Sequence, residues 1–209
     1  MISFISIVFG VIVLKASPVQ ANQVVYIPAP TWTEANGTKE DQRKLGMPLA
    51  YLEDQGFNTT SNFTEWQLDN GFQTLRNFVD NGNYSMTLGA DQACGWTDPK
   101  GVPQQIPENS IMRTSGYTRD GPCEIWLDDT LTYSSVDCLV SLPNMAYTVD
   151  YSGCGANCIM YWHTLDVSKS DRVYSWEVYK ECIPIYSNST TREKPTSASD
   201  SPGTVKPVS

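Results

Sequence analysis

The sequence predicts an all-β protein, an antiparallel β-sandwich of the immunoglobulin-like or fibronectin-like kind with long loops and disulfide staples. Its apolar stretches are short and rich in β-branched and aromatic residues, and 14 glycines and 13 prolines separate them. Short strands with frequent turn residues are typical of sandwiches. The six cysteines are Cys94, Cys123, Cys138, Cys154, Cys158 and Cys182. An even number of cysteines in an exported chain predicts disulfides, whose pairing the sequence leaves open.

The first residues predict export from the cell. The apolar run from Ile2 to Leu14 is shorter than the ~20 residues that span a bilayer, and a short polar stretch ends at Ala21. Residues 1–21 therefore have the pattern of a signal peptide, and we expect a secreted, extracellular chain that begins near Asn22 and has no membrane span. Sequons for N-glycosylation, expected to face solvent, occur at Asn36, Asn58, Asn62, Asn83 and Asn188.

One segment departs from the strand pattern. Between Glu65 and Val79 the apolar residues recur at a spacing closer to helical than to strand periodicity. This spacing predicts a short helix inside a long insertion. Gly71 interrupts the pattern, because glycine is a poor helix former.

The strand signals are strongest in the second half of the chain. Residues 123–128 alternate, which predicts a half-buried antiparallel strand with Glu124, Trp126 and Asp128 on its solvent face. The segment 158–163 is apolar on both faces and predicts a central strand. Residues 174–183 are expected to pair with it as a hairpin across a polar loop at 168–172, and Pro184 is expected to end that strand.

The chain divides into one domain and a tail. Residues 22–186 are enough for a single core, whereas residues 187–209 are rich in serine, threonine and proline and contain few large apolar residues. Such a tail cannot bury enough surface to order itself. A disordered end and an O-glycosylated stalk both fit this composition.

Charge and histidine content exclude several functions. The formal net charge is −9, which disfavours nucleic acid and acidic membranes as partners. His163 is the one histidine, so a mechanism that needs two imidazoles is excluded. We interpret His163 as a packed strand residue, since no Gly-X-Ser-X-Gly motif accompanies it to build a Ser-His-Asp triad. Cys154 and Cys158 have the spacing of half a zinc site, but no further ligand pair completes it.

Several segments resemble a known family when they are taken together. They are Pro-Ala-Pro-X-Trp at 28–32, Ala-Cys-Gly-Trp at 93–96, the stretch 116–128 with its Gly-Pro-Cys-Glu, and Trp-X-Val-Tyr-Lys-X-Cys at 176–182. In this order they resemble the lytic polysaccharide monooxygenases that oomycetes secrete, the pectin-active group in particular. The resemblance covers the whole of residues 22–186. It implies an immunoglobulin-like sandwich with a copper ion on a flat face.

The same resemblance names three copper-binding positions. The family holds copper with the amine and imidazole of its first mature residue, with a second histidine from a loop and near an axial tyrosine, a nitrogen-rich set that suits copper. The tyrosine corresponds to Tyr179. The first histidine would fall at Asn22 or Gln23 and the second at residues 118–120, where this chain has Thr118, Arg119 and Asp120. Both histidines are missing, so we expect no copper cofactor and no copper-dependent activity.

The sequence then favours a binding function. Aromatic rings stack on the apolar faces of sugars, and the chain carries 6 tryptophans and 11 tyrosines. Trp126, on the polar face of its strand, is the first candidate for such a contact, with core packing as the alternative. We expect a monomer that binds a polysaccharide such as pectin, cellulose or chitin.

Three other functions stay open. They are oxidative cleavage through a non-standard copper site, glycoside hydrolysis by a carboxylate pair such as Glu124 with Glu177, and an interaction role at a host surface. The interpretation that competes with hydrolysis is that Glu124 and Glu177 are both solvent-facing strand positions.

Overall fold

A computed structural model of the chain describes residues 23–33, 46–53, 57–170 and 173–188. Residues 1–22, and with them the predicted signal peptide and Asn22, lie outside the described residues, as do Asn36 and residues 189–209. Along the described residues, no helix is both long and apolar enough to cross a membrane.

Two sheets make up most of the fold. The smaller has the order β1-β4-β7, with β1 at Val25–Ile27, β4 at Ile111–Thr114 and β7 at Ala146–Thr148. The larger has the order β2-β9-β8-β5-β6, and its strands are β2 (Ala50–Glu53), β5 (Cys123–Leu127), β6 (Thr130–Ser135), β8 (Asn157–Ser170) and β9 (Val173–Tyr186). These neighbours are antiparallel, and the short β3 (Gln104–Gln105) adds a parallel pair to β9. A 3-10 turn, Glu108–Ser110, precedes β4.

The sheets pack face to face, which confirms the predicted all-β sandwich. Val25, Met112 and Tyr147 of the small sheet share one buried cluster with residues of the large sheet, among them Ile125 and Trp162. The alternation predicted for residues 123–128 places Cys123, Ile125 and Leu127 in this core. The immunoglobulin-like part of the prediction stays a prediction.

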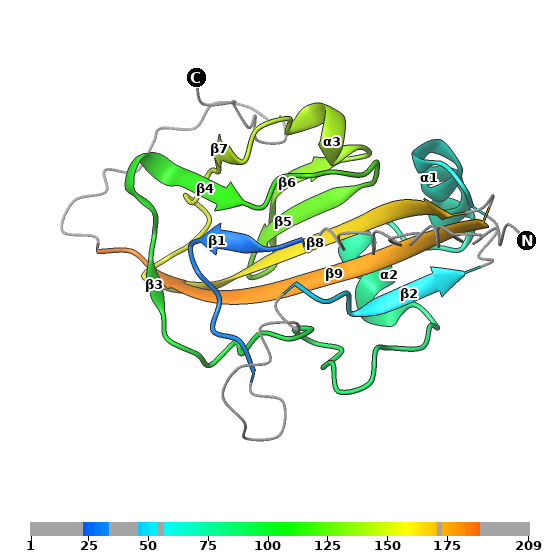
Figure 1. Ribbon diagram of the computed structural model, residues 1–209. Helices are drawn as coiled ribbons and strands as arrows, with labels where there is room; N and C mark the ends of the chain where they lie inside the picture. The colour runs from blue at the N-terminus through cyan, green and yellow to red at the C-terminus, as the bar shows by residue number, and fades with distance from the viewer. Residues whose placement is uncertain (1–22, 34–45, 54–56, 171–172, 189–209) are drawn as a thin grey trace, which may run out of the picture.

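A helical layer covers the other face of the large sheet. It contains α1 (Thr60–Asp69) and α2 (Leu75–Asn81), while the short α3 (Cys138–Ser141) follows β6 (Figure 1). Phe63 of α1 and Phe78 of α2 pack with Trp176 and Val178 of β9 in a second buried cluster. A buried cluster therefore lies on each face of the large sheet.

The predicted single helix over 65–79 is wrong, because the structure has two helices there. Gly71 has φ of +82°, a conformation that residues with a Cβ rarely adopt, and it separates α1 from α2. The side chain of Thr59 accepts a hydrogen bond from the Asn62 backbone N–H, and that of Thr74 does the same for Asn77. Each helix therefore has its own N-terminal cap.

The predicted hairpin is confirmed and is longer than expected. β8 and β9 pair without a break from Asn157 opposite Tyr186 to Ser170 opposite Val173. Pro184 does not end β9, contrary to the prediction. The Cys182 N–H points away from β8, since it donates to Thr97 Oγ1 at 2.7 Å. Residue 184 lies two positions further along the strand, so a backbone N–H there would also point away from β8. Proline at this position therefore removes no hydrogen bond between β8 and β9.

Strand β5 is buried more deeply than predicted. It lies between β6 and β8, and α2 covers the face that carries Glu124, which is only 4% exposed. Both oxygens of this carboxylate accept hydrogen bonds from the first turn of α2, from Leu75 N at 2.8 Å and Arg76 N at 2.9 Å. The prediction that Glu124 faces solvent is wrong because the residue anchors a helix end. Trp126 is half-buried and Asp128 is exposed.

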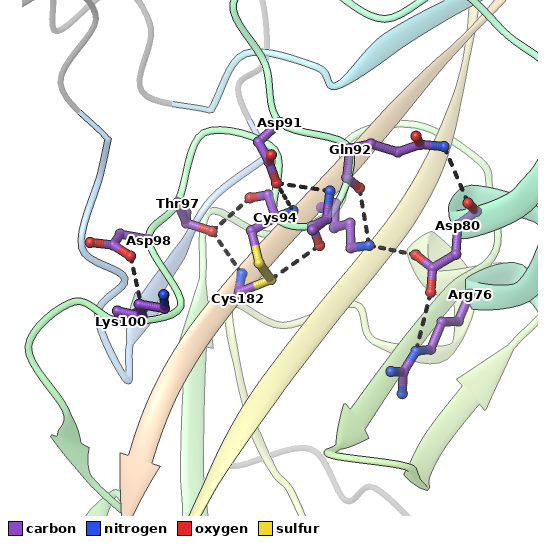
Figure 2. The surroundings of a disulfide bond; sticks show 11 residues. Arg76, Asp80, Asp91, Gln92, Cys94, Thr97, Asp98, Lys100 and Cys182 are labelled. Atoms are coloured by element: carbon purple, nitrogen blue, oxygen red, sulfur yellow. Dashed lines mark hydrogen bonds and ion pairs between the residues drawn. A yellow bond between two sulfur atoms is a disulfide. The ribbon is translucent and has the colours of Figure 1, made fainter.

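All six cysteines form disulfides, Cys94–Cys182, Cys123–Cys138 and Cys154–Cys158, so no cysteine is free to bind zinc. Figure 2 shows Asp91, Gln92 and Thr97 around the Cys94–Cys182 bond. Asp91 Oδ1 accepts from the backbone N–H of Ala93 and Cys94, and Thr97 Oγ1 donates to the Cys94 carbonyl. The loop after α2 is thereby held against β9.

The exposed sequons agree with the expected solvent-facing positions. Asn58 and Asn62 lie at the start of α1, Asn83 lies in the loop that follows α2, and Asn188 follows β9. All four side chains are exposed.

Replacing Gly95 by alanine should destabilise the protein. Gly95 has φ of +63°, and an added Cβ would lie 2.5 Å from the Lys180 backbone oxygen. The left-handed backbone alone costs about 1–2 kcal/mol for alanine. In a domain of this size each kcal/mol lowers the melting temperature by about 2–4 °C.

The control for this variant is Gly155→Ala, because a Cβ at Gly155 meets no atom within 4 Å. Thermal unfolding of the secreted, oxidised protein measures both changes. Equal melting temperatures for the two variants would contradict the close approach of the 91–97 loop to β9.

Candidate functional site

The three positions that the sequence resemblance names for copper lie at one end of the large sheet, on the face toward the small sheet. Gln23, Arg119 and Tyr179 lie there with Asp166 and Glu177, and we call these five residues the polar cluster. Gln23 Nε2 donates to Asp166 Oδ2 at 2.7 Å. Tyr179 Oη and Arg119 Nη1 both donate to Glu177 Oε2, each at 2.6 Å. Residues far apart in sequence therefore meet at one site.

Strand register creates the centre of the polar cluster. Asp166 lies directly opposite Glu177, and Thr164 lies opposite Tyr179, in the β8–β9 pairing. Opposed residues share a face of the sheet with Cβ atoms about 4.5–5.5 Å apart. Two carboxylates thus lie side by side in a buried position, Asp166 at 1% and Glu177 at 6% exposed. Glu177, like Glu124, does not face solvent as the sequence suggested.

The two carboxylates of the polar cluster have different partners. Glu177 forms an ion pair with Arg119, whose side chain is 23% exposed. Among the described residues, the hydrogen-bond donors to Asp166 are neutral: Gln23 and the Thr164 hydroxyl, the latter at 3.0 Å. Burial raises the pKa of Asp166 to about 7, and the nearby charge of Glu177 adds to this effect. Asp166 therefore holds a proton below neutral pH, while the Arg119 charge compensates Glu177.

Tyr179 stays a neutral phenol at this site. Burial raises its pKa, and its hydrogen bond to Glu177 raises the pKa further. Its hydroxyl donates a hydrogen bond to the Glu177 carboxylate. The position expected to hold an axial ligand is thus part of a carboxylate network.

The residues of the polar cluster do not fit copper. The family set needs an amine and two imidazoles, whereas the described positions supply the Gln23 amide and the Arg119 guanidinium, a cation that repels another. Within the described ranges, no group of three or more His, Cys, Asp or Glu side chains could hold a metal ion.

His163 lies on the opposite face of the sheet from the polar cluster. It sits in register between Glu124 and Lys180, is fully buried and stacks on Tyr161 with 6.3 Å between ring centroids. Neither ring nitrogen has a hydrogen-bond partner among the described residues. Burial lowers its pKa, and the charges of Lys180 and Arg76 lower it further. His163 is a neutral, packed residue, as interpreted from the sequence.

Lys180, beside His163, belongs to a structural network. Its buried ammonium group forms an ion pair with Asp80 of α2 and donates to the Gln92 carbonyl at 3.2 Å. Figure 2 shows Asp80 between this contact and Arg76, whose Nε lies 3.4 Å from Asp80 Oδ2. These bonds tie α2 and the following loop to β9.

Trp126 belongs to a second candidate site, which we call the aromatic surface and which consists of Arg76, Trp126 and Tyr161. Trp126 lies opposite Tyr161 in the β5–β8 pairing, and both rings are half-buried. The Arg76 guanidinium lies over both, 5.1 Å from the Trp126 centroid and 4.6 Å from that of Tyr161. This is cation–π geometry. The indole N–H of Trp126 donates to Glu124 Oε2 at 2.8 Å.

Sequence reasoning found Trp126 but missed its two neighbours. Tyr161 alternates with Trp162 and so shares a strand face with His163, a signal that was available. Its place beside Trp126 depends on the register between β5 and β8, which no local pattern fixes. Arg76 arrives from α2 and carries no sequence signal for this role.

The carboxylate pair considered for glycoside hydrolysis does not form. Glu124 pairs in register with His163, on the helix-covered face, whereas Glu177 lies in the polar cluster on the other face. The sheet separates the two side chains, and both carboxylate oxygens of Glu124 accept hydrogen bonds from the first turn of α2. Glu124 and Glu177 therefore cannot act together on one bond.

Comparison with known protein families gave no matching family model, and comparison with curated proteins gave no match.

The buried carboxyl of Asp166 predicts a pH-dependent stability. Its pKa of about 7 lies above the model-peptide value of 3.8, so the unfolded chain releases this proton near pH 4 and the folded chain near pH 7. The contribution of Asp166 to the free energy of unfolding should therefore fall as pH rises between these values. In Asp166→Asn this contribution is absent, and an amide at 166 can donate to Gln23 Oε1, which has no partner among the described residues.

The measurement is urea unfolding from pH 4 to pH 8, taken as the difference between Asp166→Asn and the unmodified protein. Taking this difference cancels the effect of His163, whose lowered pKa makes the free energy of unfolding rise with pH. Asp69→Asn, at an exposed carboxyl that ends α1, is the control. A difference that stays constant across this pH range would show that Asp166 is ionised throughout.

Proposed function

We propose that the chain is a secreted, glycosylated polysaccharide-binding protein on a lytic polysaccharide monooxygenase-like scaffold, without copper-dependent catalysis. The observation that carries the binding role is the aromatic surface, where Trp126 and Tyr161 lie side by side on adjacent strands. Sugars present apolar C–H faces that pack on such rings. Three disulfides support maturation in an oxidising compartment, since cytosolic proteins seldom keep them.

The aromatic surface offers a sugar both apolar and polar contacts. Arg76 lies over both rings, so a ligand meets the remaining exposed parts of the rings together with the Arg76 side chain, which is 20% exposed. Asp129, fully exposed, lies 3.5 Å from Arg76 Nη2 and can accept hydrogen bonds from hydroxyl groups. Planar rings bordered by fixed donors and acceptors match a polyol ligand.

Charge favours a neutral polysaccharide at this surface. The carboxylates of Asp80, Asp128 and Asp129 lie close enough to affect the charge at Tyr161, with Arg76 beside them and Lys180 paired to Asp80. The net charge of the chain is −9. Carboxylate-rich pectin would be repelled, whereas cellulose, chitin and methyl-esterified pectin carry little negative charge. We propose these neutral polymers as the ligands.

The absence of catalysis follows in this proposal from the composition of the polar cluster. Its arginine pairs with Glu177, and its tyrosine donates to the same oxygen. An ion pair thus occupies the positions at which the family would hold copper. The scaffold would then serve to present the aromatic surface, which lies on the opposite face of the large sheet.

Removing one ring should weaken binding to insoluble polysaccharide. Each aromatic contact contributes about 0.5–1.5 kcal/mol beyond its buried area, so Trp126→Ala and Tyr161→Ala should each raise the dissociation constant about tenfold. Depletion assays on cellulose, chitin and esterified pectin measure this. Tyr26→Ala, at an exposed tyrosine of β1 in the small sheet, is the control and should bind normally. Retention of the unmodified protein on none of the three polymers would refute the proposal.

Copper titration tests the non-catalytic part of the proposal. The signal-cleaved protein should show no submicromolar binding of Cu²⁺ by calorimetry, because the polar cluster supplies no imidazole. Tight stoichiometric binding would favour the alternative of an oxidase with a non-standard site. The polysaccharide depletion assay is independent of this result.

A further inference from the structure

A pocket of about 470 Å³ opens beside the polar cluster. One wall is Asn58 with the threonines that follow it at the start of α1, and another is the loop at Thr118, Arg119 and Asp120. Leu139 of α3 and Val167 of β8 supply apolar surface. Pockets of roughly 300–1,000 Å³ hold small ligands, and a mixture of apolar wall and hydrogen-bonding groups suits a sugar residue.

The pocket has unused hydrogen-bonding capacity. Within the described residues, Arg119 makes one hydrogen bond, from Nη1 to Glu177, although a guanidinium carries five N–H donors. Asp120 and Thr118 add acceptor and hydroxyl groups at the same wall. Hydroxyl and acetamido groups of a sugar could use all of these.

Asn58 identifies the occupant. It lines the pocket, its side chain is exposed, and it begins the sequon Asn58-Thr59-Thr60. We infer that the first sugar residues of an N-glycan on Asn58 fold back into this pocket and contact Arg119 and Leu139. The inference rests on the proposed secretion and glycosylation, and it is independent of polysaccharide binding at the aromatic surface.

The modification itself requires a donor from the secretory pathway. The Asn58 amide nitrogen forms a bond to C1 of the first N-acetylglucosamine of a lipid-diphosphate-linked oligosaccharide. The bond from C1 to the diphosphate oxygen breaks, the lipid diphosphate leaves, and the amide nitrogen loses one proton. The tethered sugar then starts at the pocket wall, so its entry is intramolecular and costs little translational entropy.

The docked glycan would join separate parts of the fold. It would link the start of α1 to the loop at 118–120 and to α3, which the chain connects only through long intervening segments. It would also cover the solvent-exposed side of the ion pair between Arg119 and Glu177. Asn62 and Asn83 are exposed but do not line the pocket, so their glycans have no such contact.

Site-resolved deglycosylation tests the inference. The full chain is secreted from a eukaryotic host, treated in its native state with an endoglycosidase, and glycopeptides are quantified over time by mass spectrometry. Release from Asn58 should be about tenfold slower than from Asn62 and Asn83, the factor expected from about 1.4 kcal/mol of docking free energy. After unfolding, the three sites should be released at equal rates.

Two variants separate docking from general instability. Leu139→Ser alters the apolar wall at a partly buried residue and should bring release at Asn58 to the rate of Asn62. Asn58→Gln should lower the melting temperature, whereas Asn62→Gln should not.

Several results would overturn the inference. They are an unmodified Asn58 beside glycosylated Asn62 and Asn83, equal native release at all three sites, or unchanged protection of Asn58 in Leu139→Ser. Absence of glycan from all three sites would overturn it together with the proposed glycosylation. Binding to polysaccharide would be unaffected in each case.

Discussion

The pairing of β8 with β9, from Asn157 opposite Tyr186 to Ser170 opposite Val173, is the centre on which the rest of the large sheet is built. β5 and β6 extend the sheet from β8, while β2 and β3 add to β9. A slip of one residue would exchange the two faces of a strand. The polar cluster would then point at the helices, and Lys180 would enter the sandwich core. Continuous antiparallel hydrogen bonds and two different buried faces together exclude that slip.

The large sheet buries ionisable groups on both faces, and their partners differ. Glu177 pairs with Arg119, Lys180 pairs with Asp80, and Glu124 binds the N-terminal turn of α2. Asp166 and Glu181 lack a paired cation among their described contacts, and burial raises the pKa of both carboxyls. Buried ion pairs add little net stability, but removing one partner of a pair leaves the other as an uncompensated buried charge. They favour one register over its alternatives.

Periodicity predicted the elements that bury one continuous apolar face, and it failed where polar residues are buried. The hairpin, the sandwich and the inward face of β5 were predictable from alternation. Glu124 and Glu177 were assigned to solvent because carboxylates seldom lie in the core. Their burial depends on partners from distant segments, α2 for Glu124 and the 118–120 loop for Glu177. The helix break at Gly71 had a local signal, whereas the caps at Thr59 and Thr74 were not recognised.

By itself, the sequence determined the β class, the cysteine count and the lack of a second imidazole, because these follow from composition and short-range spacing. Tertiary structure decided which cysteines pair, that Tyr179 meets Arg119 through Glu177, and that Trp126 lies beside Tyr161 under Arg76. Alternation along one strand indicates which of its residues share a face. It does not state which strand lies alongside or which helix covers that face, since those contacts join residues far apart in the chain.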